Sequence, residues 1–389
     1  MNIGIDKIGF YTSPFFVDLS ELANARGVDP NKYLIGIGQK KQAVIPPSQD
    51  VVTMAANAAD SMLSKEDKKK IDLIIFGTET GVDNSKSAAI YIQSLLGISN
   101  NARAFEIKQA CYGGTAGVQM AIDHIRSHPD SKVLVLAADI ARYGLKTPGE
   151  VTQGGGAISM LISKDPRILA INTSSTFFSK NIMDFWRPIQ KKEAIVDGHY
   201  STDIYIDFFL KTWSRYQKLY GQNLNNFKAI IFHLPFSKMG KKALNALFAK
   251  ESGQYDLEIK RNFDFSKIYS SLVGNLYTGS LYLSLVSLLA NSNSLKKGDQ
   301  IGLFSYGSGA QGEFYTGKIQ SSVPNLQLKN NVESLLNSRT KLSVPNYEKI
   351  YRDGIRADSE NIDYDISSDH SKYVLSGRKQ NQLKYLKQK

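Results

Sequence analysis

The sequence predicts a layered α/β protein built from two similar halves, on the strength of three observations. Four short apolar runs, at residues 72–77, 132–139, 228–235 and 300–307, are bounded by polar residues or glycine, as is typical of strands buried on both faces of a sheet. Stretches with helical periodicity lie between these runs. The order of elements in the first half of the chain also recurs in the second.

The first half begins with an expected helix over residues 51–63, followed by a Lys-rich spacer and an expected strand that ends near Glu79. Cys111 comes next, two residues before the start of the small-residue run GGTA at 113–116. A helix with its apolar residues on one face and a strand over 132–139 complete this half.

The second half repeats the plan. An expected helix over 205–220 leads through a polar spacer to a strand that ends at His233. After it come Asn275, an apolar helix over 279–290 and a strand over 300–309.

Approximate twofold symmetry between the halves would make Glu79 the counterpart of His233, and Cys111 the counterpart of Asn275. Each of the four stands at the end of an expected strand or the start of an expected helix. Ligands of α/β proteins gather at the carboxyl ends of strands. The pattern therefore predicts that these residues meet in one cleft.

A chain of 389 residues that is 42% hydrophobic is long enough to bury two such cores. We place the halves at residues 1–167 and 168–389, the second including a tail after about residue 320 in which no pattern is recognised. A single cysteine cannot form an intramolecular disulfide. The start MNIGIDKIGF lacks a signal-peptide core, and the apolar run 280–290 is too short to cross a bilayer, so we expect a cytoplasmic protein without a membrane span.

The formal charge of +12 is compatible with nucleic acid, an anionic surface or phosphorylated small molecules as partner. Much of the excess lies in the runs 65–70 and 377–389, which are typical of solvated surface or a loose tail.

Four residues have both a functional and a structural interpretation. Cys111 at a helix start is either a nucleophile with a lowered pKa or a small buried residue. Glu79 is a general base with a raised pKa or a capping loop carboxylate. His233 is a site residue or a core histidine, and the turn around Ser308 is an oxyanion hole or an ordinary tight turn.

Metal and nucleotide cofactors are not expected. The five histidines and one cysteine show no zinc spacing. The glycine-rich stretch YGSGAQG follows a strand but leads into another strand, so Walker and dinucleotide patterns are absent.

Several motifs occur in one order: GTET, ACYGGTAG, DFWRP, VDG, FHLPFSKMGKK, GNLYTGSLYLSL and GLFSYGSG. Together they resemble the hydroxymethylglutaryl-CoA (HMG-CoA) synthase family over about residues 1–320. The resemblance implies a thiolase-like fold, in which two pseudo-symmetric βαβα halves form a layered αβαβα core.

The resemblance also implies a reaction. Acetyl-CoA acetylates Cys111, Glu79 removes a proton from the acetyl methyl group, and the enolate attacks acetoacetyl-CoA, whose acetoacetyl group His233 binds and polarises. Hydrolysis releases HMG-CoA and CoA for the mevalonate pathway of isoprenoid synthesis. The family implies no cofactor beyond the CoA thioesters, and a homodimer.

By the same resemblance, further residues are expected at the site. Those expected to bind substrate are Asn275, Ser308, Tyr143, Asp184, Lys238, Lys241 and Lys242. Those expected in supporting roles are Asp83, Asp139 and Gly307. The three lysines either contact CoA phosphates or form a solvated helix start.

Two alternatives remain open from the sequence. An initiating ketoacyl synthase shares the fold and a Cys, His, Asn trio, but it generates its carbanion by decarboxylation and needs no counterpart of Glu79. A basic nucleic-acid-binding protein would suit the charge, although the aromatic residues are not interleaved with a basic motif.

Overall fold

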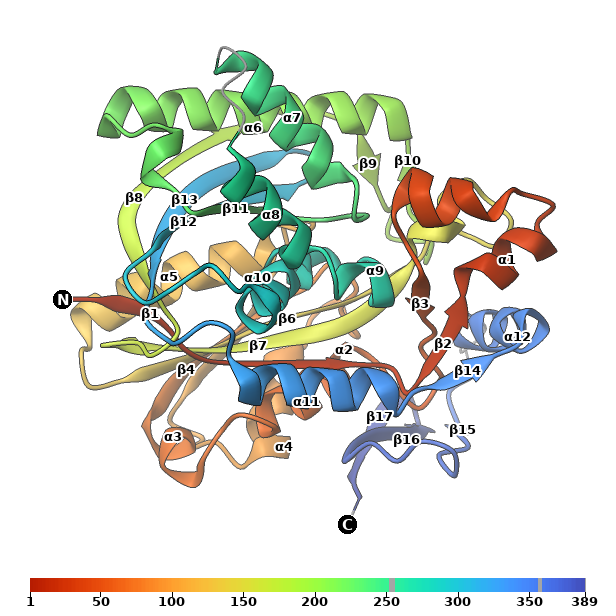
Figure 1. Ribbon diagram of the computed structural model, residues 1–389. Helices are drawn as coiled ribbons and strands as arrows, with labels where there is room; N and C mark the ends of the chain where they lie inside the picture. Colours follow the sequence, from red (N-terminus) through yellow and green to blue (C-terminus); the bar gives the residue numbers. More distant parts are fainter. Residues whose placement is uncertain (252–255, 356–358, 389) are drawn as a thin grey trace.

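The computed structural model describes residues 1–251, 256–355 and 359–388. Within these residues, nine strands form one mixed sheet (Figure 1). In spatial order they are β11 (Ala229–Phe232), β12 (Gln300–Gly307), β13 (Gln311–Ile319), β8 (Leu169–Ser179), β1 (Ile3–Thr12), β7 (Gly154–Lys164), β6 (Lys132–Ala141), β4 (Ile71–Gly77) and β5 (Arg103–Ile107).

The strand order has the same pattern on both sides of its centre. In one arm β4 pairs parallel with β6, which pairs antiparallel with β7, which pairs antiparallel with β1. In the other arm β11, β12, β13 and β8 repeat that sequence of pairings, and a short β1–β8 pairing joins the arms. The predicted repeat of a layered α/β plan is confirmed.

Helices form layers on and between the two arms. Figure 1 shows α5 (Gly113–Ser127) and α10 (Ser280–Asn291) between them, where α5 contacts β4 and β6 and α10 contacts β11 and β12. On the outside, α6 (Gly198–Tyr220) packs on β8 and β13, and α2 (Val51–Asp60) packs on β1, β6 and β7. The result is the five-layered arrangement that the resemblance implies.

The apolar runs account for this layering. Every residue of β11 is buried, and β6, β7 and β12 each expose little more than their ends. Strands covered on both faces need apolar side chains on both, which is why these runs do not alternate with polar residues.

The remaining elements complete the outer layers. The other helices are α1 (Leu19–Ala25), α3 (Lys65–Lys70), α4 (Ala88–Leu96), α7 (Met239–Lys250), α8 (Leu257–Ser266), α9 (Ser270–Val273), α11 (Leu326–Asn337) and α12 (Val344–Ile355). Three small sheets comprise β10 (Ile195–Val196) with β9 (Phe185–Trp186), β14 (Thr340–Leu342) with β2 (Phe15–Asp18) and β3 (Lys41–Ala43), and β15 (Ile362–Asp363) with β16 (Tyr373–Lys379) and β17 (Gln382–Lys387).

Two sequence expectations differ from the structure. The helix expected over 205–220 begins at Gly198, because the side chain of Asp197 accepts a hydrogen bond from the amide of Tyr200 and caps an additional part of the helix. The tail after residue 320 is integrated into the fold, since α11 packs on α10 and β14 pairs with β2.

None of the helices in the described part of the chain is both long and apolar enough to cross a membrane.

Candidate active site

Glu79 and Cys111 lie in direct contact between β4 and α5. Glu79 follows the end of β4 by two residues, and Cys111 precedes the first residue of α5 by two. The Cys111 Sγ donates a hydrogen bond to Oε1 of Glu79 at 3.2 Å. The two residues are only 9% and 8% exposed, so a thiol and a carboxyl group share a nearly dry environment.

Burial moves both groups towards their neutral forms. It raises the pKa of the Cys111 thiol well above its ordinary value, and the carboxylates of Glu79, Asp139 and Asp184 raise it further. Burial and then the negative charge of Asp139 raise the pKa of Glu79 to about 8, against smaller opposing effects of the hydrogen bond from Cys111 and of Arg187. The expectation that the helix start lowers the thiol pKa is therefore wrong, because desolvation and three nearby carboxylates outweigh the helix dipole.

Asp139 fixes the backbone around Glu79. One of its oxygens accepts hydrogen bonds from the amides of Glu79 and Thr80 at 2.9 and 3.0 Å, and from the hydroxyls of Thr78 and Thr80. The other accepts from the amide and hydroxyl of Thr278 at 3.0 and 2.6 Å. Asp139 thus joins the Glu79 loop to the segment that follows Asn275, in the other half of the chain.

His233 presents a neutral imidazole with a free nitrogen. It directly follows β11 and is 2% exposed. Its backbone is held by a bond from its amide to Phe304 and by the Tyr205 hydroxyl, which donates to its carbonyl at 2.6 Å. Burial lowers the pKa of the ring to about 3, and Nδ1 has no hydrogen-bond partner among the described residues.

Asn275 is held in one orientation. Its Oδ1 accepts from the amide of Tyr277 and the hydroxyl of Ser280, both at 2.8 Å. Its Nδ2 donates to the Tyr143 hydroxyl at 3.2 Å. The rings of Tyr143, Tyr277 and Phe185 meet edge to face, with centroids 5.7–6.1 Å apart, and pack in one apolar cluster with Cys111.

The turn after β12 approaches the Cys111 loop closely. A Cβ on Gly307 would lie 2.6 Å from the carbonyl oxygen of Gln109 and 2.7 Å from Tyr112, so a glycine is required there. Asp184 anchors the turn from the other side, accepting from the amide of Gly309 at 3.1 Å. The backbone at Ser308 is thereby placed next to the cysteine loop.

Asp184 has two further donors. The hydroxyls of Tyr306 and Ser201 donate to it at 2.8 and 3.1 Å. It is fully buried and connects β12 with α6.

The remaining predicted residues lie further out. Lys238 directly precedes α7 without a capping hydrogen bond from its side chain, and its amide donates to the carbonyl of Ile37. Lys241 and Lys242 are exposed on the first turn of that helix. Asp83 is exposed, and its carboxylate accepts from the amides of Ser85 and Lys86 at 2.8 Å. A supporting role for Asp83 stays a prediction.

The sequence did not single out several residues of the site. Tyr277 packs with Cys111, Thr278 donates to Asp139, and Arg187 bears on Glu79 with a buried Nε that has no partner among the described residues. All three lie inside the motifs DFWRP and GNLYTG. In those motifs the sequence analysis assigned roles only to Asp184 and Asn275.

Among the residues that the structure describes, no cluster of histidine, cysteine and carboxylate side chains is suited to hold a metal ion.

Known proteins match this arrangement over nearly the whole chain. A family model described as the N-terminal part of hydroxymethylglutaryl-coenzyme A synthase matches residues 1–167, and the model of the C-terminal part matches residues 169–262 and 255–353. The chain belongs to the HMG-CoA synthase family. The family match continues to residue 353, whereas the motifs indicated a resemblance only up to about residue 320.

Individual family members support the same assignment. A hydroxymethylglutaryl-CoA synthase from Enterococcus faecalis is 48% identical over 97% of this chain and 97% of its own. A solved structure of an HMG-CoA synthase complexed with CoA superimposes with a TM-score of 0.95 at 45% identity, covering 100% of both chains. A polyketide-pathway 3-hydroxy-3-methylglutaryl-ACP synthase from Bacillus subtilis is 32% identical over 94% of this chain and 92% of its own. These matches favour the synthase over the ketoacyl synthase and the nucleic-acid-binding protein.

Proposed function

We propose that this enzyme condenses acetyl-CoA with acetoacetyl-CoA and water to give HMG-CoA and CoA, as a step of the mevalonate pathway. The observation that carries the proposal is the buried contact between the Cys111 thiol and the Glu79 carboxylate at 3.2 Å. It combines a soft nucleophile with a base whose pKa of about 8 suits proton transfer near neutrality.

In the first step, Glu79 accepts the proton of the Cys111 thiol as the sulfur attacks the acetyl carbon of acetyl-CoA. The bond from that carbon to the CoA sulfur breaks, and the CoA thiolate takes the proton from Glu79 as it leaves, which restores the Glu79 carboxylate for the next step. Backbone amides at Cys111 and Ser308 are the donors for the oxyanion that forms in between. The close approach of the Gly307 turn to the cysteine loop supports this pairing.

In the second step, Glu79 removes a proton from the methyl group of the acetylated Cys111. The enolate carbon attacks the ketone carbon of acetoacetyl-CoA, and His233 donates a hydrogen bond to the ketone oxygen. That oxygen becomes an alkoxide and takes up the proton held by Glu79, which gives the hydroxyl of the product and restores the carboxylate. Because burial keeps its pKa near 3, His233 acts as a neutral imidazole. Asn275 and Tyr143 orient the same group. Water then cleaves the thioester to Cys111, which leaves a carboxylate on the product and a free thiol on the enzyme.

Other features of the proposal concern binding and context. We propose that Lys238, Lys241 and Lys242, which follow His233 at the start of α7, attract CoA phosphates. We also propose a cytoplasmic homodimer that uses no cofactor other than its thioester substrates.

Intact-mass measurement after mixing with acetyl-CoA tests the proposal. We expect one acetyl group on Cys111, which acetoacetyl-CoA then discharges with formation of HMG-CoA. Acetoacetyl-ACP and a malonyl thioester serve as control substrates. Turnover of the malonyl thioester with release of CO₂ would assign the decarboxylating reaction instead, and preference for the ACP-bound acceptor would move the substrate class to carrier proteins.

A further inference from the structure

The C-terminal helix α12 is connected to the active site through the loop that carries Tyr143. β14 pairs with β2, and this pairing anchors α12 beside α1. Tyr347 and Tyr351 of α12 are 1% and 9% exposed and pack in one apolar cluster with residues of β2 and α1. This part of the chain is more than 190 residues away in sequence from the loop that it contacts.

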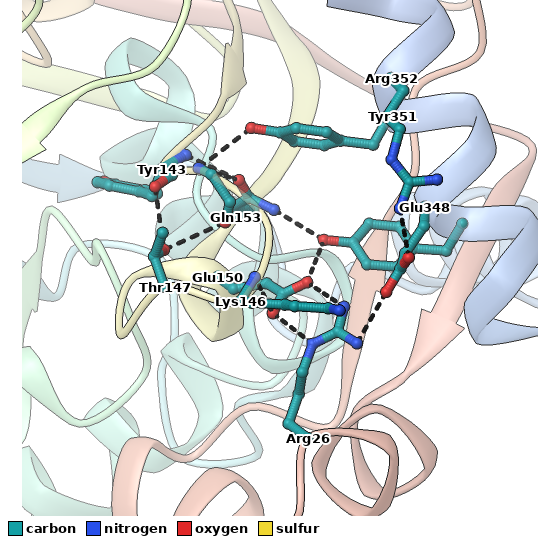
Figure 2. A network of polar contacts seen from close by, with 11 residues as sticks. Arg26, Tyr143, Lys146, Thr147, Glu150, Gln153, Glu348, Tyr351 and Arg352 are labelled. Carbon is teal, nitrogen blue, oxygen red and sulfur yellow. Dashed lines mark hydrogen bonds and ion pairs between the residues drawn. The ribbon is translucent and has the colours of Figure 1, made fainter.

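Gln153 links the helix to the loop. Its Oε1 accepts hydrogen bonds from the amides of Tyr143 and Gly144 at 2.7 and 3.1 Å. Its Nε2 donates to the Tyr347 hydroxyl at 2.9 Å. Figure 2 shows Gln153 between Tyr143 and the side chains of α12. Gln153 is 2% exposed, so water has little access to replace these bonds.

The second tyrosine of α12 makes a parallel connection. The amide of Gly144 also donates to the Tyr351 hydroxyl at 3.1 Å, and that hydroxyl donates to Glu193 at 2.7 Å. The backbone of residues 143 and 144 is therefore held by two acceptors, one of which belongs to α12.

A buried ion pair between Arg26 and Glu150 anchors one end of this network. Glu150 accepts from Nε and Nη2 of Arg26 at 2.8 and 2.7 Å and from the Tyr347 hydroxyl at 3.1 Å. Arg26 also pairs with Glu348 of α12 at 2.8 Å (Figure 2). Such bidentate pairs restrain both partners.

The loop transmits this restraint to the Tyr143 ring. A Cβ on Gly149 would lie 2.7 Å from the Tyr143 Cβ, so the loop turns tightly around that side chain. The ring itself lies in the cluster with Cys111, and its hydroxyl accepts from Asn275. A shift of the backbone at Tyr143 would move both the ring and the Asn275 contact.

We propose that Gln153, Tyr347 and Tyr351 are positioning residues, which fix Tyr143 against Asn275 for the condensation step. This inference rests on the proposed function, in which Asn275 and Tyr143 orient the acetoacetyl group. Acetylation of Cys111 does not involve that group, so the network affects the second step and spares the first.

Two variants test the role of the network. Gln153→Met removes the acceptor that the amides of Tyr143 and Gly144 share, and the pair Tyr347→Phe with Tyr351→Phe removes the hydroxyls while keeping the rings. We expect the condensation rate at saturating acetoacetyl-CoA to fall about 10-fold or more, because small misplacements at a reacting centre are costly. The acetylation rate should stay within about twofold. Tyr216→Phe is the matched control, a fully buried tyrosine whose hydroxyl bonds to Thr316 in the aromatic cluster under α6.

A double-mutant cycle separates positioning from general support. In a Tyr143→Ala background, Gln153→Met and the double tyrosine variant should cause no further loss of condensation, since the group that they position is gone. An equal additional loss in that background, an equal loss of acetylation, or no loss beyond that of Tyr216→Phe would overturn the inference. Should Gln153→Met fail to fold, the tyrosine pair gives the same readout.

Assays of the wild-type enzyme distinguish a failure of the proposed function from a failure of the positioning role. Failure of wild-type protein to become acetylated or to condense would contradict the proposed function itself. Normal wild-type condensation with unaffected variants would contradict only the positioning role.

Discussion

The two halves of the molecule place different side chains at equivalent points of the same strand pattern. Glu79 follows β4 and His233 follows β11, and each of these strands pairs parallel with the strand that comes after the next central helix. Burial raises the pKa of Glu79 to about 8 and lowers that of His233 to about 3. Desolvation thus favours the neutral form of an acid and of a base alike. In the proposed reaction Glu79 is the proton acceptor at its position, and His233 is the neutral hydrogen-bond donor at the equivalent one.

Cys111 and Asn275, the second pair of equivalent positions, also differ in their chemistry and in the residue that they contact. Cys111 precedes α5 and contacts Glu79, whereas Asn275 precedes α10 and contacts Tyr143. In the proposed reaction Glu79 and Cys111 of the N-terminal half carry the covalent chemistry, while His233 and Asn275 of the C-terminal half hold the second substrate together with Tyr143. The predictions below separate these two roles.

Cys111→Ser should abolish acetylation. A serine hydroxyl is a far weaker acid than a thiol and a poorer nucleophile towards a thioester, so the acyl transfer that the soft sulfur performs should not occur. Intact mass after incubation with acetyl-CoA measures this directly, because the chain contains no other cysteine. Labelling at the wild-type rate would remove Cys111 from the mechanism.

His233→Ala should affect the opposite half-reaction. Acetylation of Cys111 is expected to continue, while the apparent KM for acetoacetyl-CoA rises roughly 10-fold or more because a hydrogen bond to the ketone is lost. Steady-state kinetics with a separate acetylation assay resolve the two effects. A variant equally impaired in both steps would contradict the division of labour.

Replacing Glu79 with glutamine should change the pH dependence of stability. The pKa of Glu79 is about 8 in the folded protein, whereas its ordinary value is 4.5. Proton binding by Glu79 therefore stabilises the folded state, and this contribution is fully present below pH 4.5 and is lost as the pH rises through 8. A glutamine side chain at this position would remain neutral throughout. We therefore expect the difference in Tm, variant minus wild type, to be larger at pH 9 than at pH 5 for Glu79→Gln.

A surface control belongs to that experiment. Glu66 on α3 has a 75% exposed side chain, so Glu66→Gln should leave the difference between the two pH values unchanged. An advantage of Glu79→Gln that is equal at both pH values would contradict the raised pKa.

The smallest expected effect concerns the lysines after His233. Changing Lys238, Lys241 and Lys242 together to Ala should raise the KM for CoA substrates a few-fold and flatten its dependence on salt, since screening weakens contacts between exposed charges. A matched control changes three exposed lysines of α3, namely Lys65, Lys69 and Lys70. The same salt dependence in both triple variants would assign the first set to an ordinary solvated helix start.

Local patterns were sufficient to predict part of the central sheet and several of its surrounding helices. The apolar runs became β4, β6, β11 and β12 because strands covered on both faces require apolar residues throughout. The repeat of elements also indicated which residues follow equivalent strands, and the structure places Glu79 against Cys111.

Long-range polar contacts could not be predicted in the same way. The thiol pKa depends on burial and on three carboxylates that converge only in the folded chain, and Gln153 meets Tyr347 across 194 residues. Neither arrangement has a signature within a window of the sequence. The tail after residue 320 lacked a motif for the same reason, although its helix α12 is held to Arg26 and Gln153.

The measurement that tests the central claim most directly is a time course of intact mass for Glu79→Gln. Replacing Glu79 removes the acceptor of the thiol proton, but it also removes a negative charge that adds to the effect of burial on the pKa of Cys111. The departing CoA thiolate can take the thiol proton directly, so the acetyl-enzyme should still form, more slowly than in the wild type. Condensation requires a base at the acetyl methyl group, and loss of a general base costs about 10²–10⁴ in rate, so the adduct should persist after acetoacetyl-CoA is added. Discharge at the wild-type rate, with HMG-CoA as product, would contradict the account.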